Sequence, residues 1–244
     1  MRFVGVDLAW GGRRPSGLAV LDGDGNVVAG GWATTDGDIS GFLAAHDRGG
    51  AVVALDAPLV VANPAGTRRA CEAELQRRYG RVGAGPYPTN LGLLGARVRA
   101  MELVRRSDRR YVTVPRDPGR GPGWWAVEVF PAPALVELGG LARAVRYKKG
   151  PPGARRAGLE VVAGILEELG GADPPLRLDP GGALARELGR LDRLRGAGLK
   201  AVEDLADAHV CAYVGLWWWA HGPGATLVAG DDATGAILVP RPPR

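Results

Sequence analysis

The chain has 244 residues, of which 46% are apolar and 23% charged, with a formal net charge of +5. This length suits one large domain, and no apolar run approaches the roughly 20 residues of a membrane helix. The N-terminus lacks the layout of a signal peptide, so we expect a cytoplasmic protein without a membrane partner. The two cysteines, Cys71 and Cys211, lie far apart and outside any Cys/His cluster. They exclude a disulfide framework and a structural zinc site, and we expect both to be buried.

The basic charge is concentrated in one segment. Residues 68–120 hold 13 Arg and 5 acidic residues, a local net charge of +8, which leaves −3 for the remaining chain. Such a segment is typical of a surface that faces a polyanion. A solvated helical face explains the same pattern equally well.

The first part of the chain predicts an antiparallel meander, a helix and a parallel strand. Short apolar runs at 3–7, 16–21 and 27–33 are separated by turns at 10–12 and 22–26. The acidic turn at 22–26 is not an EF-hand, because Ala33 stands where the twelfth-position Glu would be. A helix follows at 36–45 with Asp36 as its N-cap. The strand at 51–55 ends in Asp56 and should lie parallel to the first strand.

The second part predicts a basic helical insertion at about 57–124, with helices at 67–79 and 91–106. Residues 83–88 form a loop, and the Pro- and Gly-rich stretch 116–123 is expected to be mobile. A strand at 125–130, helices at 154–169, 182–195 and 200–219, and strands at 226–229 and 236–239 complete the chain. This order predicts a single α/β domain over 1–244 with a ribonuclease H-like fold. Its mixed central sheet has three antiparallel strands, then parallel strands, with flanking helices.

Two carboxylates, Asp7 and Asp56, stand at the ends of predicted strands. The same ends of parallel strands share one edge of the sheet, where two neighbouring carboxylates repel each other unless a cation lies between them. Carboxylate oxygens suit Mg²⁺ or Mn²⁺. The alternative is that each Asp caps the loop that follows it.

Further acids extend this candidate site. Glu128 lies within a predicted strand, where it either needs a partner or points to solvent. Asp204 and Asp207 share one face of the last helix, which continues through the small residues Ala208, Cys211 and Gly215. That face can press closely against a sheet. A preference of acids for the helix dipole explains their place near the N-terminus, but not why they lead this face.

Other residues carry weaker signals. His209 is offset from the acidic face and is interpreted as structural. The run Trp217–Trp219 is capable of stacking on bases. We favour its packing against the core or a neighbouring subunit, which leaves a homodimer open. Lys148 and Lys149 lie in a loop and are candidates for phosphate contact. The chain contains no G-x-x-x-x-G-K-[ST], H-E-x-x-H or G-x-S-x-G motif.

Seven short motifs occur in a familiar order: G-V-D-L-A-W-G, L-D-A-P-L, R-R-A-C-E-A-E-L, Y-P-T-N, E-V-F-P, Y-K-K-G and D-L-A-D-A-H-V-C-A-Y. Together they resemble a bacterial and archaeal family called domain of unknown function 429, whose members are predicted to be ribonuclease H-like nucleases. The resemblance spans about residues 2–240. It implies that Asp7 and Asp56 are the strand acids of the wider superfamily, which includes Holliday-junction resolvases. It also implies that Asp204 and Asp207 are the acids of the final helix, and that Glu128 belongs to an E-x-[FY]-P motif.

The leading hypothesis is a metal-dependent nuclease acting on DNA or RNA. Asp7, Asp56, Asp204 and Asp207 would hold Mg²⁺ or Mn²⁺, with Glu128 as a further catalytic candidate. The candidate nucleic-acid-binding residues are Arg68, Arg69, Arg77, Arg78, Lys148 and Lys149. One alternative is a nucleic-acid-binding module that kept the fold but does not cleave. Another is a nucleotide-dependent phosphotransferase of the related actin-like fold, against which the missing hydroxyl donors of a phosphate loop argue.

Overall fold

A seven-stranded mixed sheet organises the computed structural model, which describes residues 1–10, 14–47, 49–95, 97–107, 111, 117 and 123–243. The strand order is β3-β2-β1-β4-β5-β7-β6. The first three strands are antiparallel, β1, β4, β5 and β7 are parallel, and β6 pairs antiparallel with β7. The topology is ribonuclease H-like, as the order of elements predicted. The strands are β1 (Arg2–Asp7), β2 (Ser16–Leu21), β3 (Val27–Ala33), β4 (Ala51–Leu55), β5 (Trp124–Val129), β6 (Thr226–Asp231) and β7 (Gly235–Pro240).

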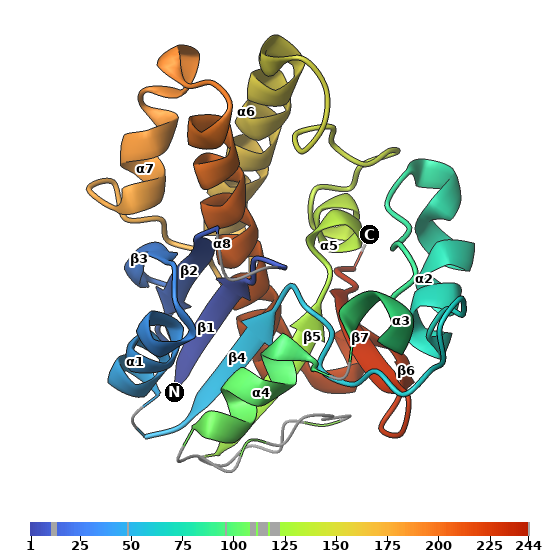
Figure 1. Ribbon diagram of the computed structural model, residues 1–244. Coiled ribbons are helices and arrows are strands. Elements are labelled where there is room, and N and C mark those ends of the chain that lie inside the picture. Colours follow the sequence, from blue (N-terminus) through green and yellow to red (C-terminus); the bar gives the residue numbers. More distant parts are fainter. Residues whose placement is uncertain are drawn as a thin grey trace.

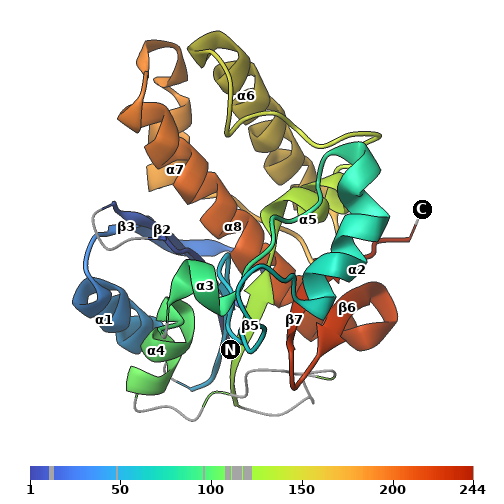
Figure 2. The ribbon, with the colours of Figure 1, turned by 45° about the vertical axis from the view of Figure 1, so that its right-hand side comes forward.

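Helices cover both faces of this sheet (Figure 1). One face carries α1 (Asp36–His46) and α4 (Arg99–Arg106), whose apolar side chains share a core with Val4, Val6 and Val53. The other face carries α8 (Ala197–His221), and Figure 2 shows α6, α7 and α8 together on that side. The remaining helices are α2 (Ala70–Tyr79), α3 (Leu91–Leu94), α5 (Pro131–Leu138), α6 (Pro152–Glu168) and α7 (Ala183–Leu188), with short 3-10 turns η1 (Gly80–Val82), η2 (Leu169–Gly171), η3 (Leu191–Arg193) and η4 (Gly222–Ala225).

The alternation of side chains along the strands decides which face each acid meets. Phe3 of β1 and the even-numbered residues Val52 and Ala54 of β4 belong to the core beneath α8. Because side chains alternate with a period of two, Asp7 and Asp56 also fall on the α8 face. In β5 the residues on that face are Trp125, Val127 and Val129. Glu128 therefore belongs to the opposite face.

Two glycines let α8 lie unusually close to the sheet. A Cβ atom at Gly5 of β1 would stand 1.8 Å from the carbonyl oxygen of Ala208, and one at Gly17 of β2 would stand 2.0 Å from that of Asp204. Gly215 of α8 lies over Val52 and Ala54 in the same way. The small-residue face predicted for the last helix thus does contact the sheet.

Several elements differ from the sequence-based expectation. The helix expected at 91–106 is two helices, because Gly95 ends α3 with a positive φ of 70°. The N-cap of α1 is Thr35 rather than Asp36: its side chain accepts a hydrogen bond from the Asp38 backbone N–H. Helix α5 was not expected, since Pro131 and Pro133 suggest a loop, yet proline is tolerated in a first turn.

Other expectations have simpler outcomes. The helix expected at 67–79 begins only at Ala70, and the one expected at 182–195 is the short α7 followed by η3. Most of the stretch 116–123 lies outside the described residues. Cys71 and Cys211 are buried and free, as predicted. Within the described ranges, no helix has the length and apolar character needed to cross a membrane.

Candidate metal centre and its surroundings

Asp7, Asp56 and Asp207 converge from three separate elements. Asp7 is the last residue of β1, Asp56 directly follows β4, and Asp207 lies within α8. Each offers a carboxylate oxygen, and these three atoms lie within 4.8 Å of one another. The parallel pairing of β1 with β4 and the close approach of α8 produce this arrangement. We call these three residues the Asp cluster.

Burial and mutual repulsion make the charged form of this cluster costly. The pKa of Asp7 is raised well above its ordinary value, by burial first and then by the charges of Asp207 and Asp56. Burial raises the pKa of Asp56 to about 6, although the Lys148 ammonium opposes the shift. The Oδ2 atom of Asp7 is buried and has no hydrogen-bond partner among the described residues. A buried carboxylate oxygen without a donor is what a hard cation would satisfy.

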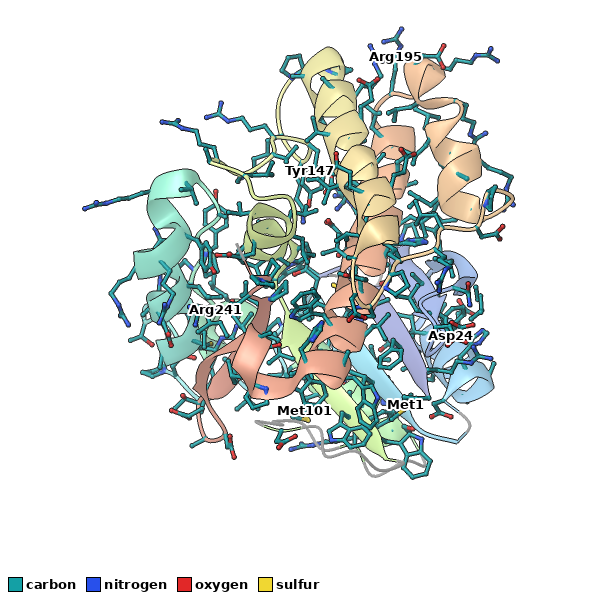
Figure 3. The ribbon with its side chains drawn as sticks, turned by 180° about the vertical axis from the view of Figure 1, so that it is seen from behind. Met1, Asp24, Met101, Tyr147, Arg195 and Arg241 are labelled. Carbon is teal, nitrogen blue, oxygen red and sulfur yellow. The ribbon has the colours of Figure 1, made fainter. Side chains whose placement is uncertain are left out.

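Lys148 and Tyr147 are the other groups that contact the Asp cluster. The Lys148 Nζ lies 2.6 Å from Asp207 Oδ2, although it is not aligned as a hydrogen bond, and 3.7 Å from Asp56 Oδ2. The Tyr147 hydroxyl donates a hydrogen bond of 2.6 Å to Asp207 Oδ1. Tyr147 is labelled in Figure 3, which views the α8 side of the molecule. When its three carboxylates are ionised, the single Lys148 ammonium leaves the cluster with an excess of negative charge, so the residues present fit a divalent cation.

Asp204, the fourth predicted metal ligand, does not join this group. Its Oδ1 lies 2.5 Å from the Lys200 Nζ, which also contacts Glu203 at 2.6 Å. Arg155 contacts Glu203 from the other side, at 3.2 Å. Asp204 therefore already has a cationic partner on its own helix, one turn away. It lies beside the Asp cluster rather than within it.

Glu128 lies in a separate cluster, in which two carboxylates share one guanidinium. Its two carboxylate oxygens accept hydrogen bonds of 2.8 and 2.6 Å from Arg69, and the Leu59 backbone N–H donates a third at 3.2 Å. Arg69 also contacts Glu72 at 2.8 Å. We call Arg69, Glu72 and Glu128 the Arg69 cluster. Burial raises the pKa of Glu128 even though Arg69 opposes the shift.

The predicted phosphate-binding arginines have different environments. Arg69 is only 4% exposed and engaged with two carboxylates, so its guanidinium does not face solvent as the nucleic-acid hypothesis expected. Arg77 and Arg78 are exposed on α2, where Arg78 pairs with Glu74 at 3.0 Å, and Arg68 is partly exposed. Lys149 is exposed beside Tyr87, with its Nζ 3.1 Å from the Tyr87 hydroxyl.

A cleft of about 690 Å³ opens onto the Asp cluster. The sequence pattern did not indicate Lys200 or Trp10 as part of this site. Tyr147 was not predicted as a site residue either. It directly precedes Lys148 and Lys149 in the Y-K-K-G motif, and this position was the signal that could have identified it. The cleft is lined by Asp7, Leu8, Ala9, Trp10, Arg14, Pro15, Asp56, Lys148, Lys200, Glu203 and Asp204.

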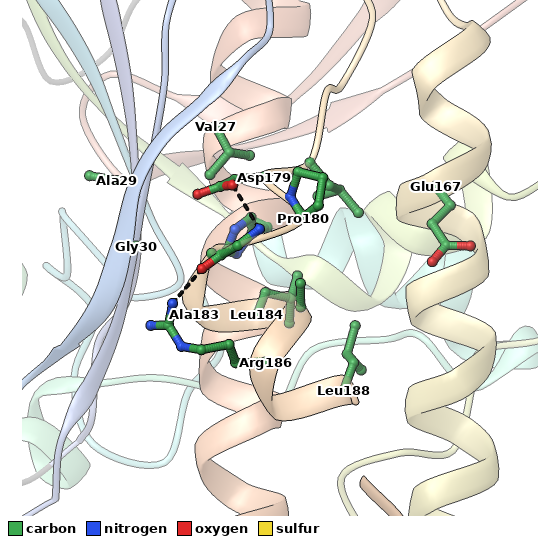
Figure 4. A pocket seen from close by; sticks show the side chains of 15 residues that line it. Val27, Ala29, Gly30, Glu167, Asp179, Pro180, Ala183, Leu184, Arg186 and Leu188 are labelled. Atoms are coloured by element: carbon green, nitrogen blue, oxygen red, sulfur yellow. Dashed lines mark hydrogen bonds between the residues drawn. The ribbon is translucent and has the colours of Figure 1, made fainter. Parts of the chain in front are cut away.

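A second cavity, of about 480 Å³, has a different character (Figure 4). Its wall is mainly apolar, with Val27, Leu184 and Leu188 from β3 and α7. His209 also lines it. The buried ring has Nδ1 2.7 Å from the Leu205 carbonyl oxygen, and burial lowers its pKa to about 4. This environment agrees with the structural interpretation of His209.

The tryptophan run at the end of α8 packs against the core. Trp217 and Trp218 are buried, and the Trp218 and Trp219 rings lie 6.4 and 5.0 Å from the Trp125 ring. Aromatic rings at these separations stabilise each other beyond their buried area. The run therefore packs against the core, which is one of the two arrangements that the sequence favoured.

One family model, described as "Protein of unknown function (DUF429)", matches residues 5–234 of the chain. The matched range includes the whole Asp cluster together with Tyr147 and Lys148. No curated protein and no solved structure matches the chain. The chain therefore belongs to the DUF429 family, a family of proteins of unknown function.

Proposed function

We propose that the protein is a divalent-metal-dependent nuclease that hydrolyses phosphodiester bonds of nucleic acid. The observation that supports this most strongly is the Asp cluster: three carboxylates from β1, the end of β4 and α8 have oxygens within 4.8 Å, and the buried Asp7 Oδ2 has no hydrogen-bond partner among the described residues. Two neighbouring carboxylates repel each other, and a hard cation such as Mg²⁺ or Mn²⁺ relieves that repulsion. The carboxyl ends of β1 and β4 and the helix α8 supply this group, and Asp7 and Asp56 line the cleft beside it.

Each residue of the site has a task in this proposal. Asp7, Asp56 and Asp207 would hold the cation, and its chemistry would be to acidify a water and to offset negative charge on the scissile phosphate. Tyr147 fixes the orientation of the Asp207 carboxylate through its hydrogen bond. Lys148 is 35% exposed and borders the cleft, so its ammonium is placed to contact the phosphate as well as the acids. Asp204 and Glu203 hold Lys200 at the same cleft.

The test is cleavage of labelled single-stranded, duplex and junction DNA and RNA with Mg²⁺ or Mn²⁺. Asp7→Asn should reduce cleavage by at least about 100-fold, since losing even an outer-shell partner of a metal ligand costs about 10–100-fold. Asp192→Asn is the matched control, because Asp192 is an exposed carboxylate whose ion-pair partner is the neighbouring Arg193. Wild-type cleavage that survives in Asp7→Asn, or the absence of cleavage on every substrate, would contradict the proposal.

The position of Lys148 supports a second candidate function, a nucleic-acid-binding module that does not cleave. Its Nζ already contacts two members of the Asp cluster, so an ammonium takes part of the role of a metal ion. This candidate predicts salt-sensitive binding of nucleic acid with no metal-dependent turnover. The cleavage panel, run beside a binding assay, separates the two functions.

A further inference from the structure

Two aromatic side chains beside the Asp cluster are largely exposed. Trp10 is 71% and Tyr87 is 77% exposed, more than any other large apolar side chain in the described part of the chain. Their segments are far apart in sequence, yet both residues line one cavity of about 290 Å³. Paired exposed aromatic side chains at a cavity mark a contact site for a ligand or partner.

This cavity adjoins the cleft beside the Asp cluster. Trp10, Asp56 and Lys148 line both spaces, so a molecule in the cavity lies directly beside the Asp cluster. Lys149 lies over the Tyr87 ring, with its Nζ 5.0 Å from the ring centroid. The cavity entrance thus combines aromatic faces with a positive charge, the combination that holds single-stranded nucleic acid.

The inner wall of the cavity is apolar or already hydrogen-bonded. Pro58, Pro86 and Phe130 contribute apolar surface. Three of its polar side chains, Arg69, Glu72 and Glu128, are engaged with one another, whereas Asp56 and Lys148 stand on the side shared with the cleft. The backbone N–H of Thr89 is also used, since it donates to Glu72 at 2.9 Å. Away from the side shared with the cleft, the cavity therefore offers mainly stacking and apolar contact.

We propose that this cavity binds one unstacked nucleobase of the strand whose phosphate lies at the Asp cluster. The inference rests on the proposed nuclease function and specifies its substrate: a single-stranded segment, or a nucleotide swung out of a duplex. The cavity of about 290 Å³ lies at the lower limit of ligand-pocket size, about 300 Å³, and this size suits a single planar heterocycle. Because every base has a stacking face, and because Arg69, Glu72 and Glu128 in the wall are already paired with one another, base identity should have little influence.

The experiment measures binding of fluorescein-labelled oligonucleotides by anisotropy, in EDTA and again with Ca²⁺. The probes are a single strand, a duplex of the same sequence, and an abasic phosphodiester of equal length and charge. The wild type should bind the single strand about tenfold or more tightly than the abasic strand, since base–aromatic stacking contributes about 1–3 kcal/mol per base. The double variant Trp10→Ala/Tyr87→Ala should remove this difference.

Two further variants serve as controls. Trp10→Phe/Tyr87→Phe keeps both aromatic faces and should retain the preference for bases. Val161→Ala removes another exposed apolar side chain, on α6, and should leave binding unchanged. Thermal unfolding of each variant verifies that it is folded.

The outcomes separate this inference from the nuclease proposal. Base-dependent binding that requires the aromatic pair, without metal-dependent cleavage, supports the base cavity and contradicts the nuclease. Cleavage with equal affinity for normal and abasic strands supports the nuclease and overturns the base cavity. Absence of binding to any probe overturns both. Self-association that depends on Trp10 and Tyr87, with no base effect, would assign the pair to a protein interface and overturn the inference.

Discussion

The Asp cluster and the Arg69 cluster lie near each other but treat their carboxylates in opposite ways. In the Arg69 cluster, one guanidinium contacts two carboxylates at 2.6–2.8 Å, and backbone N–H groups of Leu59 and Thr89 complete the hydrogen bonds. In the Asp cluster, the Lys148 ammonium contacts only Asp56 and Asp207, and Asp7 Oδ2 has no hydrogen-bond partner in the described structure. Both clusters contain buried acids, so burial alone does not distinguish a metal site. The Asp cluster differs because the buried Asp7 Oδ2 has no hydrogen-bond donor among the described residues.

The largest effect is expected when the Arg69 cluster loses its cation. Arg69→Met leaves Glu128 and Glu72 buried without their guanidinium and should lower the free energy of unfolding by about 3–5 kcal/mol. Urea denaturation of the two proteins measures this difference. Adding Glu128→Gln to Arg69→Met should recover much of the loss, because an uncharged partner costs less to bury. If Arg69→Met were as stable as the wild type, the ion pairs of Arg69 would contribute nothing to the free energy of unfolding.

His209, on the reverse side of α8, provides a contrast in pH dependence. Its pKa of about 4 in the folded protein lies below the ordinary 6.5, so the unfolded chain takes up the proton first. The stability that His209 contributes is complete above about pH 6.5 and is lost as the pH falls towards 4. The full loss amounts to about 3 kcal/mol. Asp56, whose pKa is raised to about 6, changes stability in the opposite direction over the same range.

The difference between the wild type and His209→Asn isolates this contribution. Asn keeps an N–H donor for the Leu205 carbonyl oxygen but does not titrate. The unfolding free energies of the two proteins, measured from pH 4 to pH 7, should diverge by the amount that His209 loses. Parallel curves would show that the ring is not buried in its neutral form.

Metal ions should distinguish the two clusters directly. A cation at 100 times its dissociation constant stabilises a protein by about 2.7 kcal/mol when it binds only the folded state. Mg²⁺ or Mn²⁺ should therefore raise the melting temperature of the wild type and of Glu128→Gln, but not of Asp7→Asn. An equal response from Asp7→Asn, or loss of the response in Glu128→Gln, would place the cation elsewhere.

The smallest predicted effect concerns Lys148. Its ammonium competes with a metal ion for Asp207 and Asp56, so Lys148→Met should tighten Mn²⁺ binding. The expected change is about tenfold in the dissociation constant, which corresponds to about 1.4 kcal/mol of binding free energy. Isothermal titration with Mn²⁺ measures the affinity, and Lys149→Met serves as the control because Lys149 contacts Tyr87 instead. Weaker binding in Lys148→Met would indicate that Lys148 organises the acids rather than competes.

The strand acids were predictable because strand periodicity and parallel pairing are local rules. Asp7 and Asp56 follow apolar strands whose parallel register brings Val6 opposite Leu55, so their convergence follows from the sequence. Glu128 could not be assigned in this way. Its side chain points away from α8, because Trp125, Val127 and Val129 are the β5 residues that face that helix. Which residues of β5 face α8 depends on how β5 pairs with β4, and the sequence does not show this register.

The contacts of Tyr147, Lys148 and Arg69 depended on tertiary structure. Tyr147 and Lys148 lie in a loop between α5 and α6, and nothing in a loop sequence tells which strand end it reaches. Arg69 was grouped with basic surface residues because a run of arginines indicates charge but not burial. Its carboxylate partner Glu128 lies 59 residues away, across the sheet edge.

The glycines beneath α8 enlarge the mutational target of the site. A side chain at Gly5 would meet the Ala208 backbone, so α8 would have to move off β1, and Asp207 would move with it. Gly17 holds the same helix near Asp204. Inactivating changes can therefore arise at positions that carry no functional group, and a survey of natural variants that inspected only carboxylates would overlook them.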